Sequence, residues 1–216
     1  MLKRLLPGLP VVCVVLLLPC LWAQAADPSA YEDTSPDGTP EERAAIYNAM
    51  SKAAKAGDPQ AQYEFGALNE DWKAAYHNYP VTLKWYKAAA MQGHIASQHR
   101  LGYMYRRRVY VDTDFHEAIK WYTMAARQGH AESMTSLGHM YDHAEDFYEP
   151  QDYVNAYHWF NLAIKLGDKP AVRNQERITK WMTPEQIKKA NARTDAWVAK
   201  YGLKKATVLK KSIKSD

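Results

Sequence analysis

A motif that recurs every 36 residues constrains this chain more than any other feature. Residues 101–105 (LGYMY) match residues 137–141 (LGHMY), and residues 65–69 (FGALN) keep the large apolar residue and the glycine. A second motif has the same period, since residues 84–94 (KWYKAAAMQGH) match residues 120–130 (KWYTMAARQGH). Repetition at a fixed period of this length is typical of helical repeat proteins.

The third copy of the second motif is displaced. Residues 158–167 (HWFNLAIKLG) lie 38 residues after their counterparts, whereas the first motif keeps its spacing of 36 residues. We therefore place two extra residues in the loop 144–152.

The spacing of apolar residues predicts two helices in each repeat. In the first helix, one face is formed at i, i+4, i+7 and i+8 by Ala61, Phe65, Leu68 and Asn69. In the second, one face is formed at i, i+3, i+4 and i+7 by Thr82, Trp85, Tyr86 and Ala89. Each pair leaves an apolar side uncovered, so successive pairs must stack. We predict a core role, and no cofactor site, for the tryptophans of this stripe, Trp85, Trp121 and Trp159.

Glycines recur at two places in the repeat. In mid-helix a glycine costs about 1 kcal/mol relative to alanine, so we expect the backbone of the partner helix to approach closely there. These glycines are Gly66, Gly102 and Gly138. At the ends of the second helices we expect left-handed C-caps, formed by Gly57, Gly93, Gly129 and Gly167.

Both ends of the repeat array have helix-start signals. The segment 39–42 (TPEE) is a capping box that opens a lone helix, which we interpret as a half-repeat over 40–57. Repeats follow at about 58–93, 94–129 and 130–167. The segment 183–186 (TPEQ) opens the last helix of a cap over 168–200, and Gly202 is expected to end that helix. The array therefore covers residues 39–200.

The first 25 residues have the pattern of a signal peptide. Lys3 and Arg4 precede an apolar run over 11–18, and Ala23 and Ala25 match the A-x-A cleavage pattern. The run is shorter than the roughly 20 residues that a membrane span needs. We expect cleavage after Ala25, a periplasmic or secreted protein, and no membrane insertion of the mature chain; a retained N-terminal anchor is the alternative.

Cleavage would change the chemistry available to the chain. Cys13 and Cys20 would leave with the signal peptide, and the formal charge would fall from +4 to +2 because Lys3 and Arg4 leave as well. A net charge this small does not support nucleic-acid binding. Residues 26–38 are expected to form a flexible linker, and the lysine-rich residues 201–216 a basic flexible tail.

These motifs resemble the Sel-1-like repeats (SLR), which are relatives of the tetratricopeptide repeats (TPR). The family pattern is roughly A-x3-L-G-x2-Y, a loop with an Asp, and A-x2-W-Y-x2-A-A-x2-G. Residues 101–129 carry nearly all of it, and residues 182–187 resemble the usual C-terminal cap. The chain departs from the pattern at Arg107 and Arg108, which replace loop glycines, and at Asn69, which replaces the tyrosine.

The resemblance implies an all-α fold, a right-handed α-solenoid of stacked antiparallel helix pairs with a helical C-terminal cap. It also implies an adaptor that binds a protein or peptide, with bacterial members often in the cell envelope. Related chains act in envelope assembly, host contact and toxin neutralisation. We therefore predict an exported protein-interaction adaptor. The alternatives are an immunity-type inhibitor of an envelope-acting toxin or hydrolase, and a secreted effector that contacts a host protein.

The face of the first helices opposite the core is the predicted partner-binding surface. At 100° per residue, three positions in each first helix point farthest from the core face. In TPR-like stacks the first helices line the concave side, so the resemblance makes these nine residues a candidate groove; an ordinary solvated face is the alternative. They are Tyr63, Ala67, Glu70, His99, Tyr103, Arg106, Thr135, His139 and Asp142.

Enzymatic and metal-binding functions find little support in the residues. We find no glycine-rich phosphate loop, no G-x-S-x-G motif, and no cysteine after residue 25. His139 and His143 are four residues apart on a helix and could share a zinc ion. Without an H-E-x-x-H motif we interpret them as surface residues. We therefore predict no enzyme, and no catalytic, cofactor-binding or metal-binding residues.

Overall fold

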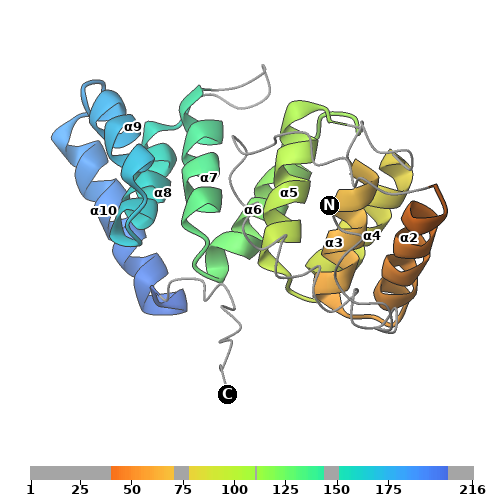
Figure 1. Cartoon of the computed structure of the whole chain (residues 1–216). Helices are drawn as coiled ribbons and strands as arrows, with labels where there is room; N and C mark the ends of the chain where they lie inside the picture. Colours follow the sequence, from red (N-terminus) through yellow and green to blue (C-terminus); the bar gives the residue numbers. More distant parts are fainter. Residues whose placement is uncertain (1–39, 71–77, 110, 144–150, 204–216) are drawn as a thin grey trace, which may run out of the picture. The chain divides into compact units, whose positions relative to one another are not determined.

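The computed structural model describes residues 40–70, 78–109, 111–143 and 151–203, and these are helical with short connections. The chain divides within α4 into two compact units, Met1–Trp85 and Tyr86–Asp216. The first contains α2 (Pro40–Lys55), α3 (Pro59–Glu70) and most of α4 (Tyr79–Met91). No strand occurs among the described residues, so the predicted all-α class is confirmed (Figure 1).

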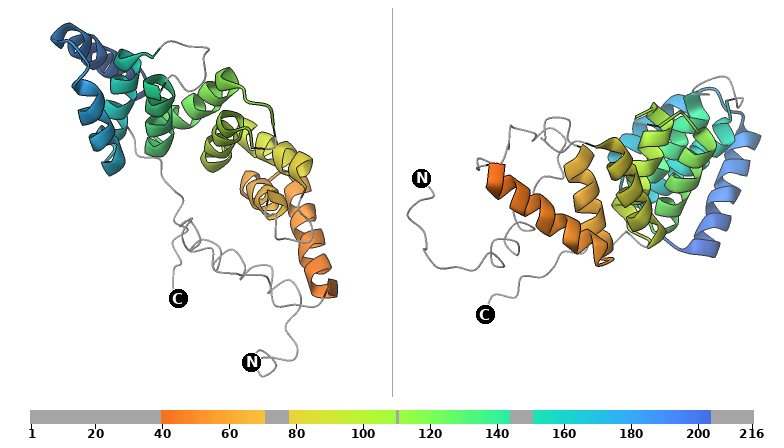
Figure 2. Two further views of the ribbon diagram at one scale, coloured as in Figure 1. Left: turned by 90° about the horizontal axis from the view of Figure 1, so that it is seen from above. Right: turned by 90° about the vertical axis from the view of Figure 1, so that its right-hand side faces the viewer.

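The helices of the second unit are α5 (Ile95–Arg107), α6 (Phe115–Arg127), α7 (Ala131–His143), α8 (Tyr153–Lys165), α9 (Lys169–Thr179) and α10 (Pro184–Tyr201). In the second unit, each helix from α5 to α8 packs against the next one along the chain, and the last helix packs on α8 (Figure 2). The closest associations join α5 to α6 and α7 to α8, while α8 also packs on α9 and α10. Stacked helix pairs are what the repeat predicts, and this expectation is confirmed.

Local signals in the sequence set the helix ends. Asp114 caps α6 by accepting a hydrogen bond from the backbone N–H of Glu117 at 3.0 Å. The predicted capping box forms at the start of α10, where Thr183 and Gln186 each accept from the other's backbone N–H. Gly202 ends that helix, as expected. The glycines that close the second helices all have a positive φ between 82° and 96°, so their predicted left-handed role is confirmed: Gly57, Gly93, Gly129 and Gly167.

Two of the mid-helix glycines, Gly102 and Gly138, face a side chain where we expected a backbone. A Cβ atom on Gly102 would lie 2.6 Å from a ring carbon of Tyr122 on α6, and one on Gly138 would overlap the ring of Phe160 on α8. An aromatic ring of the partner helix therefore fills the space, whereas we expected the two backbones to meet. Because protein interiors are close-packed, the ring fits only where glycine leaves the space that a side chain would occupy.

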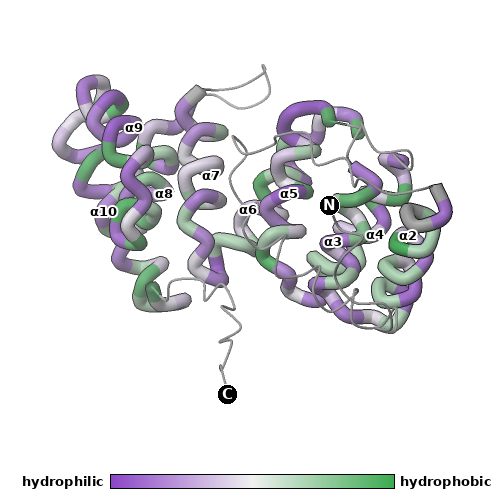
Figure 3. The backbone as a smooth tube through the Cα atoms, viewed as in Figure 1, coloured by the Kyte–Doolittle hydropathy of each residue, from purple (hydrophilic) through white to green (hydrophobic). Residues whose placement is uncertain are grey.

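Each helix alternates between hydrophobic and hydrophilic residues along its length, as a helix with one buried face must (Figure 3). Trp121 and Trp159 are buried, with 3% and 7% of their surface exposed, which confirms their core role. Trp85 is half-buried and packs its ring edge on Phe65 at 5.7 Å. The deepest aromatic side chains come one position later in each repeat, at Tyr86, Tyr122 and Phe160.

Several predicted segments lie outside the described residues. These are the signal peptide over 1–25, the linker over 26–38, the capping residue Thr39, most of the loop 144–152 and the tail after Leu203. No described helix has the length and hydropathy needed to cross a membrane.

Candidate partner-binding site

The predicted face begins on α3, in the first unit. Tyr63, Ala67 and Glu70 are all half-buried there. The other six positions lie on α5 and α7 in the second unit. Their surroundings differ sharply between these two helices.

On α5, Tyr103 is the exposed member of the predicted set, with 37% of its surface open. The guanidinium of Arg100 lies 5.5 Å from the centre of its ring, within the range of a cation–π interaction. Leu101 and Met104, on the other side of the same helix, are fully buried. Tyr103 is therefore a surface side chain on a helix that the core holds in place.

The two neighbouring predicted residues on α5 also make contacts inside the unit. His99 lies against α7, with Nδ1 3.0 Å from Oγ of Ser133 and Nε2 3.5 Å from a carboxylate oxygen of Glu132. Arg106 hydrogen-bonds the phenol of Tyr122, whose pKa is raised to about 12 mainly by burial. Both side chains thus help to hold α5, and they offer a partner less than Tyr103 does.

On α7, the expected exposure is wrong for two residues. Thr135 and Asp142 have only 8% and 0% of their surface exposed. The hydroxyl of Thr135 donates to Asp168 at 2.5 Å, and Asp142 forms an ion pair with Arg177. These partners come from α9 and the residue that precedes it. The helical pattern placed these residues opposite the core face, but it could not show that α9 contacts them there.

His139 belongs to the same contact between α7 and α9. Its Nε2 lies 3.2 Å from the side-chain nitrogen of Asn174, and its ring meets Phe160 edge-on at 5.4 Å. The zinc alternative gains no support: within the described residues, no three His, Cys, Asp or Glu side chains are grouped closely enough to hold a metal ion. The side chain of His143 lies outside the described residues.

The end of α5 carries two arginines that the predicted site did not include. Arg107 and Arg108 are both exposed. Arg108 is the C-cap and has φ 55° and ψ 37°, the left-handed region in which a side chain other than glycine costs about 1–2 kcal/mol. The replacement of the loop glycines by Arg107 and Arg108 was the sequence signal that could have extended the site.

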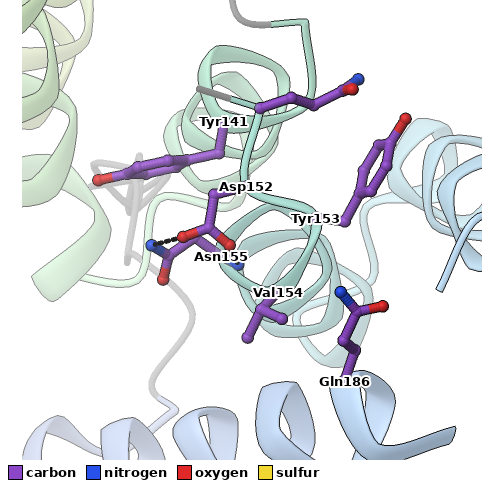
Figure 4. A pocket seen from close by; sticks show the side chains of 7 residues that line it. Tyr141, Asp152, Tyr153, Val154, Asn155 and Gln186 are labelled. Carbon is purple, nitrogen blue, oxygen red and sulfur yellow. Dashed lines mark hydrogen bonds between the residues drawn. The ribbon is translucent and has the colours of Figure 1, made fainter. Parts of the chain in front are cut away.

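A first pocket, of about 390 Å³, opens where α8 begins. Tyr141 and Tyr153 lie on either side of Asp152 and Asn155 (Figure 4). Asp152 is committed to the fold because it caps α8 and accepts a hydrogen bond from the side chain of Asn155 at 2.8 Å. It is therefore poorly placed to serve as a general base.

A second pocket, of about 380 Å³, adjoins the first and shares Tyr141 and Asn155 with it. It is lined by aromatic and basic side chains of α8 and α10, including Trp159, Trp197 and Arg193. Sequence reasoning missed this pocket because its two halves are about 40 residues apart in the chain and no motif links them.

His158 lies in this second pocket but has the properties of a structural residue. Its Nδ1 is 3.1 Å from the hydroxyl of Thr194 on α10. Burial, assisted by the charge of Arg193, lowers the pKa of His158 to about 4. The imidazole is therefore neutral at pH 7, and it helps to join α8 to α10.

Comparison with known proteins assigns the family. The sequence profile of the Sel1 repeat matches residues 59–94, 95–130 and 131–168, which together make up half of the chain. The chain belongs to the Sel1 repeat family. The third matched range is two residues longer than the others, in agreement with the two extra residues expected in that repeat.

Two solved structures are similar to this Sel1 repeat protein. One is a protective antigen present in uropathogenic Escherichia coli strains, with an SLR fold; it has 26% identity and a TM-score of 0.64 over 79% of this chain. The match covers 36% of that protein, so this chain spans about a third of its length. The other is a Sel1 repeat protein from Oxalobacter formigenes, with 26% identity, a TM-score of 0.52, and coverage of 59% of this chain and 95% of that one.

A third structure, an immunity protein from Pseudomonas aeruginosa, covers 98% of this Sel1 repeat protein and 91% of its own chain. With 19% identity and a TM-score of 0.36, it supports no functional argument. A comparison with curated protein sequences finds no match. Sel1 repeat proteins are in general scaffolds for protein interactions and are typically not enzymes.

Proposed function

We propose that this Sel1 repeat protein is an exported scaffold that holds a protein or peptide partner at the C-terminal end of α5. The binding surface consists of Tyr103, Arg100, Arg107 and Arg108. The predicted signal peptide supports export, and the scaffold role of the family supports a protein partner. No catalytic role is part of the proposal.

The exposure of Tyr103 carries the proposal. Tyrosine and arginine are among the residues that most often dominate binding energy at protein interfaces, and here a guanidinium lies 5.5 Å from the centre of the ring. The helix beneath them is anchored by Leu101 and Met104. A rigid element that presents an aromatic side chain loses little conformational entropy when a partner binds.

The charge of this surface indicates the chemistry of the partner. Arg107 and Arg108 are exposed, and neither forms an ion pair with a described carboxylate. Complementary charge steers association and selects the partner, so the segment that docks here is acidic. The left-handed backbone of Arg108 supports this role. Glycine would adopt this conformation without strain, so the presence of an arginine here indicates a function for its side chain.

Site-specific photo-crosslinking in cells tests the proposal. A photoreactive amino acid at position 103 should give one discrete protein adduct, and the same amino acid at Lys188, an exposed residue of α10, should not. Arg107→Gln together with Arg108→Gly should greatly reduce that adduct, whereas Lys188→Gln with Lys189→Gln should leave it unchanged. Equal labelling from positions 103 and 188 would contradict the proposed surface.

The same strains test export. We expect the mature protein in the periplasmic or secreted fraction, with Ala26 as its first residue by N-terminal sequencing. The similar E. coli protein is a protective antigen, which favours a secreted effector as a second candidate. Strict confinement to the periplasm would argue against that second candidate and leave the scaffold proposal standing.

A further inference from the structure

The second pocket is an open hollow lined by side chains of α8, α10 and the end of α7. Its rings pack on one another, with Trp159 and Trp197 centred 4.8 Å apart and Trp197 and Tyr201 centred 4.4 Å apart. Tyr141, from the end of α7, completes the aromatic lining. A volume of about 380 Å³ lies at the lower end of the range for ligand sites, about 300–1,000 Å³. The pocket therefore suits one bulky side chain and the backbone attached to it.

Hydrogen bonds between the two helices hold this shape. Asn161 donates to Asn191 at 3.0 Å, and His158 lies 3.1 Å from Thr194. Arg193 donates to Oδ1 of Asn155 at the edge of the pocket. Because these contacts join α8 to α10 beside the aromatic rings, the two helices hold the pocket lining in place.

The pocket is positively charged. Its lining includes Arg193 and Lys200 and contains no Asp or Glu. Lys200 and Arg127 lie over the ring of Tyr201, at 5.1 Å and 5.3 Å from its centre. None of these three cations forms an ion pair with a carboxylate of the described residues. The cationic charge is thus available to an anionic ligand.

Asp152 is linked to Arg193 by hydrogen bonds through Asn155, but it does not neutralise the arginine. The side chain of Asn155 stands between, because its nitrogen donates to Asp152 at 2.8 Å and its oxygen accepts from Arg193. Asp152 in turn caps α8. It is therefore linked to Arg193 through a neutral amide and forms no ion pair with it.

We propose that this pocket binds the C-terminal residue of a partner polypeptide, with an aromatic side chain and a free α-carboxylate. The ring would pack against Trp197 and Tyr201, and the carboxylate would accept hydrogen bonds from Arg193 with support from Lys200. A guanidinium matches a carboxylate with two parallel hydrogen bonds. This inference rests on the proposed scaffold function but assigns a second surface to it.

A chain terminus fits better than an internal acidic segment. In a C-terminal residue the ring and the carboxylate share one Cα atom, so both fit within a pocket of about 380 Å³. The tail of this chain is a poor occupant, because residues 204–214 contain five lysines that a cationic pocket repels. An external terminus is therefore the occupant that both the size and the charge favour.

Fluorescence anisotropy with the full chain tests this inference. The probe is a labelled peptide, Gly-Ser-Gly-Ala-Leu-Phe, with either a free carboxylate or a C-terminal amide. We expect the free acid to bind at least about tenfold more tightly than the amide, as a charge-assisted hydrogen bond implies. Equal affinity of the two forms would overturn the assignment.

Variants locate the effect within the pocket. Arg193→Gln should weaken binding of the free acid about tenfold or more, and Arg193→Lys should restore part of the loss. Arg173→Gln, an exposed arginine of α9, is the matched control and should bind like the parent. Thermal unfolding of each variant shows whether it is folded. An Arg193→Gln protein that is folded and binds with full affinity would contradict the proposal.

Two further probes distinguish other ligands. N-acetyl-phenylalanine that binds as tightly as the peptide would reassign the pocket to a small aromatic acid. An amidated peptide with internal glutamates that binds as tightly would reassign it to acidic segments. The Tyr103→Ala variant should keep the affinity for the free-acid peptide, so failure of the α5 surface and failure of this pocket are separate results.

Discussion

The same polar face of the repeat is exposed at Tyr103 on α5 and covered on α7. Tyr103 is exposed, whereas Asp142, on the same face of the next first helix, is fully buried. The difference comes from the helix that follows. After Gly167, α9 carries Asn174 and Arg177, which reach His139 and Asp142. At the matching distances after Gly129, α7 carries the shorter Ser136 and the ring of His139. The longer side chains of α9 thus cover on α7 a face that the side chains of α7 leave partly open on α5.

Arg177→Ala should have the largest effect, because it uncovers a buried charge. Asp142 would lose its ion-pair partner while remaining inside the unit. Losing one member of a buried pair costs about 3–5 kcal/mol, but Arg177 is half-exposed, so we expect about 2 kcal/mol in the free energy of unfolding. Urea denaturation measures this. Adding Asp142→Asn should restore part of the stability, and a double variant no more stable than Arg177→Ala would show that the charge is not the cause.

Acidification should weaken the contact between α5 and α7, which contains histidines. His130 caps α7, and burial together with the nearby charge of His99 lowers its pKa to about 4. The unfolded chain, with a pKa near 6.5, then binds the proton more tightly. The stabilisation that neutral His130 provides is therefore complete above pH 6.5 and is lost as the pH falls towards 4. We expect a loss of about 2 kcal/mol over that window.

His130→Asn provides the control for this pH dependence, because asparagine can still cap the helix. The difference in unfolding free energy between parent and variant should shrink as the pH falls from 7 to 4.5. If the two proteins keep a constant difference over that range, His130 does not titrate as inferred.

Arg108→Gly should have the smallest effect on stability and the opposite sign. Glycine adopts the left-handed C-cap without strain, so we expect a stability gain of about 0.5–1 kcal/mol. Binding of the partner at α5 should fall at the same time. Met91→Gly, at another exposed position, should lower stability instead. A destabilised Arg108→Gly protein would show that the arginine serves the fold.

Much of the fold could be predicted because its signals are local. A glycine such as Gly93 marks a left-handed C-cap through its own backbone, and Thr183 with Gln186 forms a capping box within one helical turn. The core role of Trp121 followed from its recurrence at the structural period. For the candidate site, the sequence predicted Tyr103 and drew attention to Arg107 and Arg108, which depart from the repeat pattern.

The covered residues and the aromatic pocket could not be predicted in this way. Thr135 meets Asp168 from 33 residues away, and Trp159 meets Trp197 from 38 residues away. The spacing of apolar residues along the sequence shows which side of a helix faces the core, because a helix is formed by residues that are close in the chain. Which side chain from the next helix reaches across that face depends on packing between helices. For this protein the sequence by itself determined the repeat, its caps and its core positions; only the tertiary structure decided which polar faces are open to a partner.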